Sequence, residues 1–132
     1  LNFQAITIDN RPFKLSDLRG SYVLLDFWGS WCGPCIANMP KLVKLVADNS
    51  QKVDIIGFPY EFQKDTSKAQ KIIRQFNLQW RQIIQLRDHP FQRPDVIKQL
   101  YIEHFPTYML IDASGKILVR TSKLEELTEV LK

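Results

Sequence analysis

The segment Asp26–Pro40, DFWGSWCGPCIANMP, holds both cysteines of the 132-residue chain, with two residues between them and an apolar run just before them. That run, YVLLDF at 22–27, is typical of a strand buried on both faces. Apolar residues then recur at helical spacing from Cys35 to about Asn49, and VDIIGF at 53–58 indicates another buried strand. Strand, helix and strand in this order predict a right-handed βαβ unit with parallel strands.

The flanking segments predict the rest of a mixed sheet. FQAITI at 3–8 and PFKL at 12–15 are expected to form a hairpin, and TYMLID and ILVRT a second one with Gly115 in its turn. A further strand, WRQIIQL, is expected at 80–86. Helices are predicted over Ser67–Phe76, Asp95–Tyr101 (begun by Pro94) and Lys123–Leu131. The expected fold class is α/β, a central mixed sheet with helices on both faces.

Composition favours a single globular domain over residues 1–132, because 45% apolar side chains can build one substantial core. The net charge of +4 is spread along the chain among acidic residues, so nucleic acid is not an expected partner. No run reaches the roughly 18 to 20 apolar residues of a membrane span, and LNFQAITIDN lacks the pattern of a signal peptide. The chain begins without Met, so a preceding signal, anchor or domain stays open.

The two cysteines lie where a strand leads into a helix. The unpaired N–H groups and the dipole of a helix N-terminus would favour a thiolate at Cys32, which makes the sulfur a nucleophile. Gly33 and Pro34 form a tight connection, and Pro34 suits the first helical turn. Cys35, one turn along, can form a disulfide with Cys32. The pair is expected to open and close, and it needs no metal or organic cofactor because the two sulfurs hold the electrons.

Two alternatives for the cysteines are weaker. A zinc site needs four ligands, and the only histidines, His89 and His104, lack the usual close spacing. A purely structural disulfide would stabilise little, because closing so short a loop removes little entropy from the unfolded chain.

Asp26 is unusual because it lies inside the apolar strand. A buried carboxyl should have a raised pKa unless it is paired, which suits proton exchange with Cys35 near neutral pH. The alternative is an Asp that reaches solvent at the strand end.

The segment around the two cysteines, together with later parts of the chain, resembles a known protein family. DFWGSWCGPC, with Pro40 five residues after Cys35 and FPTYMLID much later, is similar to the thioredoxin superfamily. The lead-in FKLSDLRGSYVLL, the long segment between Gly57 and Pro106 and the ending LIDASGKI resemble TlpA/ResA/DsbE-like thiol-disulfide oxidoreductases. The resemblance implies a thioredoxin-like fold with an N-terminal hairpin and an inserted middle segment.

The resemblance also implies roles for individual residues. Cys32 would be the nucleophile, Cys35 the resolving thiol, and Asp26 the buried acid that assists it. Pro106 would form a cis peptide bond and leave the backbone at Phe105 free to pair with an extended substrate. The residues expected to contact substrate are Trp31, Gly33, Pro34, Phe105 and Pro106.

Several positions carry weaker expectations. Glu61 falls where ResA-like proteins have a carboxylate near the dithiol, but the local match favours a surface loop. Asn38 departs from the Glu that TlpA-like proteins often have there. His104 is expected at the surface, and Trp28 and Trp80 in the core.

The resemblance implies a thiol-disulfide oxidoreductase outside the cytoplasm, acting as a monomer on disulfide-containing proteins. The Gly-Pro dipeptide between the cysteines resembles thioredoxin and favours a reductant, recharged by an upstream thiol reductant. The alternatives are a cytoplasmic thioredoxin and a binding or scaffold module of a larger envelope protein. A peroxidase is less favoured, because Cys32 lacks the Thr-X-X-Cys setting of a peroxiredoxin.

Overall fold

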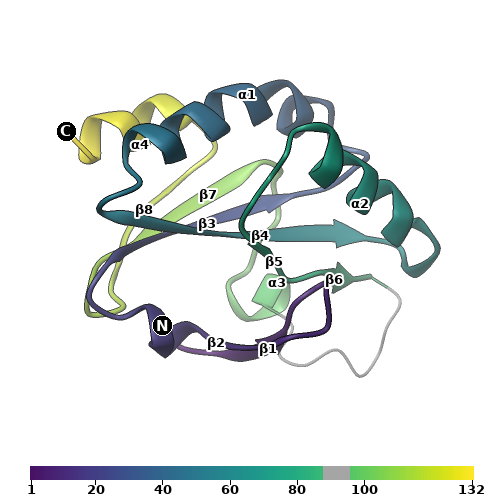
Figure 1. Cartoon of the computed structure of the whole chain (residues 1–132), viewed down its shortest axis with the longest axis horizontal. Coiled ribbons are helices and arrows are strands. Elements are labelled where there is room, and N and C mark those ends of the chain that lie inside the picture. Colours follow the sequence, from purple (N-terminus) through teal and green to yellow (C-terminus); the bar gives the residue numbers. More distant parts are fainter. Residues whose placement is uncertain (88–95) are drawn as a thin grey trace.

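The computed structural model describes residues 1–87 and 96–132 and places a six-stranded mixed sheet at the centre (Figure 1). The strand order is β5-β4-β3-β7-β8, and β6 pairs with the carboxyl end of β4. Central strand β3 runs parallel to β4 and antiparallel to β7. The strands are β3 (Tyr22–Trp28), β4 (Val53–Glu61), β5 (Arg81–Gln82), β6 (Gln85–Leu86), β7 (Thr107–Ile111) and β8 (Ile117–Thr121).

Strand β3 is buried on both faces, as its apolar run predicts. Side chains alternate between the faces of a strand, so each face receives every second residue. Val23, Leu25 and Phe27 enter one cluster of buried apolar side chains. Leu24 and Trp28 enter the other. The sheet therefore separates two cores, and β3 contributes to both.

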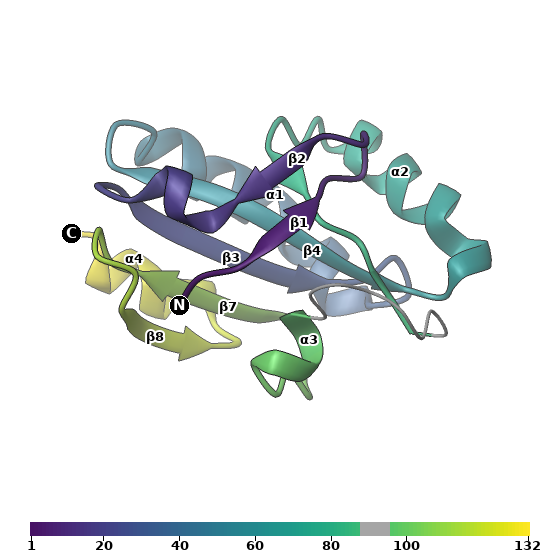
Figure 2. The same ribbon diagram turned by 90° about the horizontal axis from the view of Figure 1, so that it is seen from below.

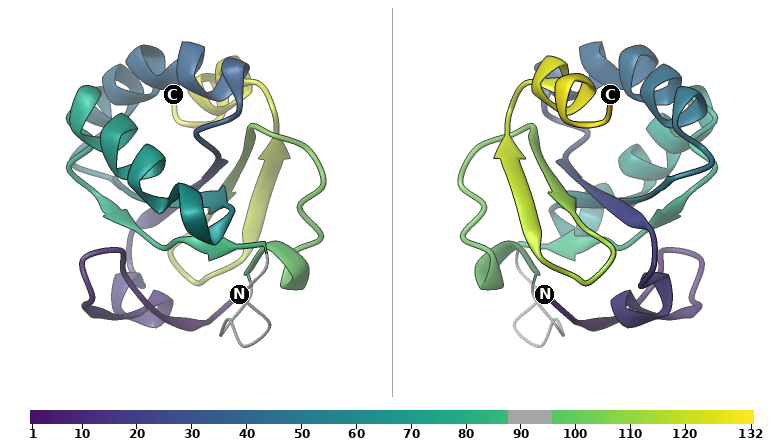
Figure 3. Two further views of the ribbon diagram at one scale, coloured as in Figure 1. Left: turned by 90° about the vertical axis from the view of Figure 1, so that its right-hand side faces the viewer. Right: turned by 90° about the vertical axis from the view of Figure 1, so that its left-hand side faces the viewer.

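Three helices cover one face of the sheet, called here the helical face: α1 (Gly33–Asp48), α2 (Thr66–Gln75) and α4 (Leu124–Val130), as Figures 1 and 3 show. Met39 and Leu42 of α1 and Leu127 of α4 are buried against it. Helix α1 joins β3 to the parallel strand β4, which confirms the predicted βαβ unit.

The opposite face is covered by the N-terminal hairpin, the 3-10 turn η1 and the short helix α3. In Figure 2, which views the molecule from below, the hairpin strands cross in front of the sheet. Phe3 packs edge-on against Phe58 with ring centroids 5.7 Å apart, and an Ile8 N–H to Gln82 C=O bond of 2.7 Å ties the hairpin to β5. The elements are β1 (Gln4–Ile6), β2 (Pro12–Lys14), η1 (Leu15–Leu18) and α3 (Val96–Gln99). Helices therefore lie on both faces, as predicted, but the long ones share one face.

Some element boundaries differ from the sequence prediction. Helix α1 begins at Gly33, so Pro34 lies in its first turn as expected, and the helix starts two residues before the apolar periodicity that predicted it. The stretch predicted as one strand, WRQIIQL, forms two short strands, β5 and β6, along the same edge of β4. Between their partners on β4 lies Pro59, which has no N–H to donate to a ladder. The predicted start of α3 at 94–95 lies outside the described residues.

One core lies between the sheet and the N-terminal hairpin. Replacing a large aromatic ring in this core should show how much it stabilises the fold. Phe58 is fully buried and stacks on Phe27 with ring centroids 4.8 Å apart. Phe58→Ala is expected to lower the free energy of unfolding by about 3–5 kcal/mol, measured by urea denaturation of the oxidised protein. Leu118→Ala, at an exposed position of β8, is the control and should cost about 1 kcal/mol or less. Equal losses would contradict this account of the core.

Candidate active site

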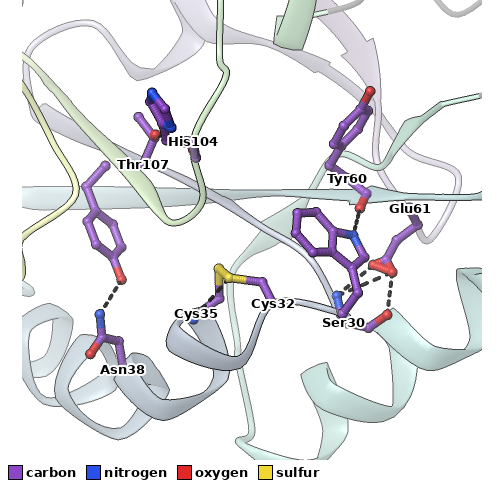
Figure 4. Close-up of a disulfide and its surroundings, with 10 residues drawn as sticks. Ser30, Cys32, Cys35, Asn38, Tyr60, Glu61, His104 and Thr107 are labelled. Carbon is purple, nitrogen blue, oxygen red and sulfur yellow. Dashed lines mark hydrogen bonds between the residues drawn. A yellow bond between two sulfur atoms is a disulfide. The ribbon is translucent and has the colours of Figure 1, made fainter.

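Cys32 and Cys35 form a disulfide at the start of α1, with their Cα atoms 5.3 Å apart (Figure 4). Cys32 is the N-cap of the helix, and its Sγ accepts a hydrogen bond of 3.2 Å from the backbone N–H of Cys35. Pro34 lies in the first turn, where its missing N–H removes no helical bond. When the disulfide is reduced, the same N–H and the helix dipole stabilise a Cys32 thiolate.

The disulfide lies just below the surface. Cys32 is 4% exposed and Cys35 2%, so Cys32 is the slightly more exposed residue of the pair. A large partner must therefore make close contact with the surrounding loops before its own sulfur reaches Cys32.

Asp26 lies on the same side of the sheet as the two cysteines. In β3 it has the same orientation as Leu24 and Trp28, which enter the helical-face core together with Cys32 and Cys35. Asp26 as a whole residue is 1% exposed, so the alternative of an Asp that reaches solvent is wrong. Burial raises its pKa from 3.8 to about 8.

Glu61 corrects one prediction from the sequence. It was expected in a surface loop, but it is fully buried, because β4 continues to this residue and pairs there with β6. Its Oε2 accepts a 2.7 Å hydrogen bond from the Ser30 N–H, and Oε1 accepts one from the Ser30 hydroxyl (Figure 4). Burial raises the pKa of Glu61, and these bonds oppose that rise. The end of β4 is thereby tied to the loop that carries Cys32.

Four rings gather beside the disulfide, and we call them the aromatic platform: Trp31, Tyr60, Phe62 and Phe105. The Trp31 indole N–H donates a 2.7 Å bond to the Tyr60 C=O, and Phe105 stacks on Tyr60 with centroids 5.5 Å apart. Phe105 also meets Trp31 edge to face at 5.2 Å. Trp31 and Phe62 are 47% and 41% exposed. The platform therefore offers ordered apolar surface to a partner.

The guanidinium of Arg87 lies over the aromatic platform. Its central carbon is 4.9 Å from the Trp31 ring centroid, 4.6 Å from that of Tyr60 and 4.8 Å from that of Phe62. A cation at this distance from a ring face is attracted by the ring quadrupole. The Arg87 N–H also donates to the Glu61 C=O at 3.0 Å. Arg87 belongs to no sequence motif, so nothing in the sequence alone pointed to it.

The loop across from the disulfide carries the predicted proline. The Phe105–Pro106 peptide bond is cis, as the resemblance implied. The Thr107 hydroxyl donates a 2.6 Å bond to the His104 C=O, while the His104 side chain is exposed, as expected (Figure 4).

Asn38, the position that departs from the family, has a structural partner. Its Nδ2 lies 3.3 Å from the hydroxyl of Tyr108 and donates to it. Burial, together with the carboxyl of Asp26, raises the pKa of Tyr108. Asn38 thus joins α1 to β7 through a neutral hydrogen bond.

The remaining predictions concern metals, membranes and the core. Within 1–87 and 96–132, no cluster of three or more His, Cys, Asp or Glu side chains could hold a metal ion. His89, one ligand of the zinc alternative, lies outside the described residues. In the same two ranges, no helix has the length and apolar character to cross a membrane. Trp28 is fully buried, as expected, and Trp80 is half-buried.

A thioredoxin-like sheet with a Cys-X-X-Cys disulfide at the start of a helix defines the class of thiol-disulfide oxidoreductases. The model of the AhpC/TSA family matches residues 1–120, and the chain belongs to that family.

Individual relatives agree with this class. A thiol-disulfide oxidoreductase ResA from Bacillus thuringiensis is 30% identical over 99% of this chain and 73% of its own length. A thiol-disulfide oxidoreductase from Bacteroides fragilis is 25% identical with a TM-score of 0.78, covering 98% of this chain and 97% of its own. A secreted Mycobacterium tuberculosis disulfide oxidoreductase homologous to Escherichia coli DsbE has a TM-score of 0.78 at 21% identity, covering 98% and 93%. The chain is a thiol-disulfide oxidoreductase with the Cys32–Cys35 pair as its disulfide-forming motif.

The raised pKa of Asp26 predicts how stability depends on pH. Between about pH 4 and 8 the unfolded state has lost the Asp26 proton while the folded state keeps it, so stability falls as the pH rises. The slope from this one group is at most about 1.4 kcal/mol per pH unit. The Asp26→Asn variant lacks this titrating group, so its stability should not fall in this way. The free energy of unfolding of the variant minus that of the wild type should therefore increase by about 2–4 kcal/mol from pH 5 to 8.

Urea denaturation of both oxidised proteins at the two pH values measures this difference, since disulfide-bonded cysteines do not titrate. Glu61 also has a raised pKa, but it is present in both proteins and cancels in the comparison. Parallel pH profiles for the two proteins would show that Asp26 ionises normally in the folded state.

Proposed function

We propose that the chain is an extracytoplasmic reductase of protein disulfides, built as a single domain over residues 1–132. The observation that carries the proposal is the position of Cys32. It caps the N-terminus of α1, remains slightly exposed, and has Cys35 within bonding distance and Asp26 buried on the same side of the sheet. Both cores pack on one sheet, which supports a single domain.

Reduction proceeds in two exchange steps. The Cys32 thiolate attacks one sulfur of the substrate disulfide, and the other substrate sulfur leaves as a thiolate that takes a proton from solvent. Near its pKa of about 8, Asp26 is ionised in a fraction of the molecules, and in these the Cys35 thiol gives its proton to the Asp26 carboxylate. The resulting Cys35 thiolate attacks the Cys32 sulfur. The second substrate sulfur leaves as a thiolate and is protonated in turn. Two electrons pass from the dithiol to the substrate, and Cys32 and Cys35 end as a disulfide.

The pKa of Asp26 suits the transfer of a proton from Cys35. This pKa of about 8 is close to that of an ordinary thiol, about 8.5, so a proton can pass between Cys35 and Asp26 at little cost. An exposed carboxylate with a pKa near 4 would be a much weaker base.

The direction of the redox reaction and the cellular compartment of the protein are supported by separate observations. Gly33 and Pro34 form the thioredoxin-like dipeptide, which favours a reducing couple that an upstream thiol reductant recharges. One structural neighbour is described as secreted, which supports a site of action outside the cytoplasm. Labelling of the thiols in whole cells by a membrane-impermeant alkylating reagent distinguishes the two compartments.

The first test is the reduction potential of the Cys32–Cys35 pair, measured by equilibration with dithiothreitol buffers and thiol trapping. A reductase should give a value near thioredoxin's, about −270 mV. Cys35→Ser is the control: it cannot close the disulfide and should accumulate a mixed disulfide with a protein substrate. A potential near the roughly −120 mV of DsbA would make the protein an oxidant. A pair that does not cycle would favour the scaffold alternative.

The aromatic platform is the proposed docking surface for the substrate. It adjoins Cys32 through Trp31 and the cis-proline loop through Phe105, so a strand paired with the Phe105 backbone would lie across it. Gly33 and Pro34 complete the contact surface around the sulfur. Arg87 adds a positive charge to the platform, so substrates with a carboxylate near their cysteine should be favoured.

Two disulfide-linked peptides that differ only in Glu or Lys two residues from the cysteine test this preference. The wild type should reduce the Glu peptide with a kcat/KM about two- to fivefold higher than the Lys peptide, as expected for one exposed charge pair. Arg87→Gln should abolish the difference. Arg74→Gln, at an exposed position of α2, changes the net charge equally and should preserve it. Loss of the preference in both variants would assign it to overall charge.

A further inference from the structure

The side-chain amide of Gln82 has a fixed orientation. Its Oε1 accepts a 3.1 Å hydrogen bond from the Trp28 indole N–H, and the two side chains are 2% and 0% exposed. Because an indole N–H can only donate, the oxygen must be the atom that faces Trp28. The Nε2 group, with two hydrogens to donate, is therefore directed elsewhere within the core.

Gly57 places that amide beside Asp26. A Cβ atom on Gly57 would lie 1.9 Å from Oε1 and 2.7 Å from Nε2 of Gln82, so the amide occupies the space where a side chain at 57 would be. Gly57 is in register with Gln82 on one side and with Asp26 on the other. Neighbouring strands are about 4.8 Å apart, so the amide lies one strand spacing from the Asp26 backbone.

The two side chains have complementary unmet hydrogen bonds. Within the described ranges, the buried side-chain atoms that lack a hydrogen-bond partner are Asp26 Oδ2, Gln82 Nε2 and Trp80 Nε1. The first is an acceptor and the second a donor, and both lie on the helical face. Trp80 lies just before β5, two residues ahead of Gln82, and is only half-buried, whereas Gln82 is in the register row of Gly57 and Asp26.

We propose that Gln82 is a positioning residue for Asp26: its Nε2 donates a hydrogen bond to the Asp26 carboxylate, directly or through one water, when that carboxylate takes the proton of Cys35. The role in exchange rests on the proposed function, but the bond itself does not. Trp28 holds the oxygen of the amide so that the nitrogen is presented to Asp26. A donor at this place stabilises the ionised form of a carboxyl that burial alone would keep protonated.

Gln82 also lines a cavity that Asp26 does not reach. This cavity of about 1030 Å³ is lined as well by residues of α1, α2 and the hairpin turn. Asp26 itself is 1% exposed and does not line this cavity. The Gln82 side chain thus borders both this cavity and the register row that contains Asp26.

The groups that could disturb a titration of Asp26 are few. Tyr108 faces it from β7, and Cys32 and Cys35 lie on the same side at the start of α1. On β4 the residue opposite Asp26 is Gly57, which has no titratable group. Glu125 of α4 contributes to the raised pKa of Tyr108. In the oxidised protein the cysteines do not titrate, so Asp26 is the group in this set expected to ionise near pH 8.

The direct test uses the oxidised wild-type protein and no substrate. The Nε2 proton and nitrogen NMR signals of Gln82 are followed from pH 5 to 10, and they should shift with the same midpoint as the Asp26 carboxyl carbon. In Asp26→Asn this shift should vanish. Gln82 signals that do not respond to pH in a folded wild type would overturn the proposal.

Gln82→Met tests the energetic effect, since it keeps the length of the side chain and removes the donor. The pKa of Asp26, read from its carboxyl carbon, should rise by about one unit or more. Gln85→Met is the matched control: Gln85 is equally buried in β6, but its Oε1 accepts from the N–H groups of Val96 and Ile97. This variant loses structural bonds and should leave the Asp26 pKa unchanged.

The outcomes separate a positioning role from a structural one. An unchanged Asp26 pKa in folded Gln82→Met, or equal shifts in both variants, would contradict the proposal. If Gln82→Met does not fold, the wild-type titration still decides the question. Because neither readout needs turnover, a protein that fails to reduce disulfides would overturn the proposed function and leave the Gln82–Asp26 bond to be judged separately.

Discussion

The parallel pairing of β3 with β4 is the constraint on which the site depends. Seven residue pairs, from Tyr22 opposite Val53 to Trp28 opposite Pro59, run in register, so both strands end at the same edge of the sheet. The loop after β3 and the last residues of β4 are therefore neighbours, although they are far apart in the sequence. The Ser30–Glu61 and Trp31–Tyr60 hydrogen bonds both form across this junction, and α1 starts from it.

What the sequence predicts well is local. Cys32, Pro34 and Cys35 are consecutive in a short motif, and their geometry follows from the N-terminus of one helix, which the structure confirms. Asp26 could be predicted as buried because its neighbours in the strand are apolar on both sides. The cis bond before Pro106 came from the resemblance rather than from the composition of the segment.

What the sequence does not predict depends on distant partners. Glu61 is polar and follows a strand, which suggests a loop, but its partner Ser30 lies 31 residues away. Gln82 lies in a two-residue strand, too short for any periodicity, and its partner Trp28 is 54 residues away. Arg87 gains significance only when Trp31, Tyr60 and Phe62 converge. In each case the pairing is created by strand register, which single residues do not encode.

The close contact at Gly57 also couples the residue types that positions 57 and 82 can hold. Because the Gln82 amide fills the space above Gly57, positions 57 and 82 share one volume. A longer side chain at 57 would fit only with a small residue at 82, and it would then be the group beside Asp26. Related sequences should thus vary at these two positions together, and a polar end group can be supplied from either strand. The proton affinity of the central acid can in this way be retuned without altering the cysteine motif.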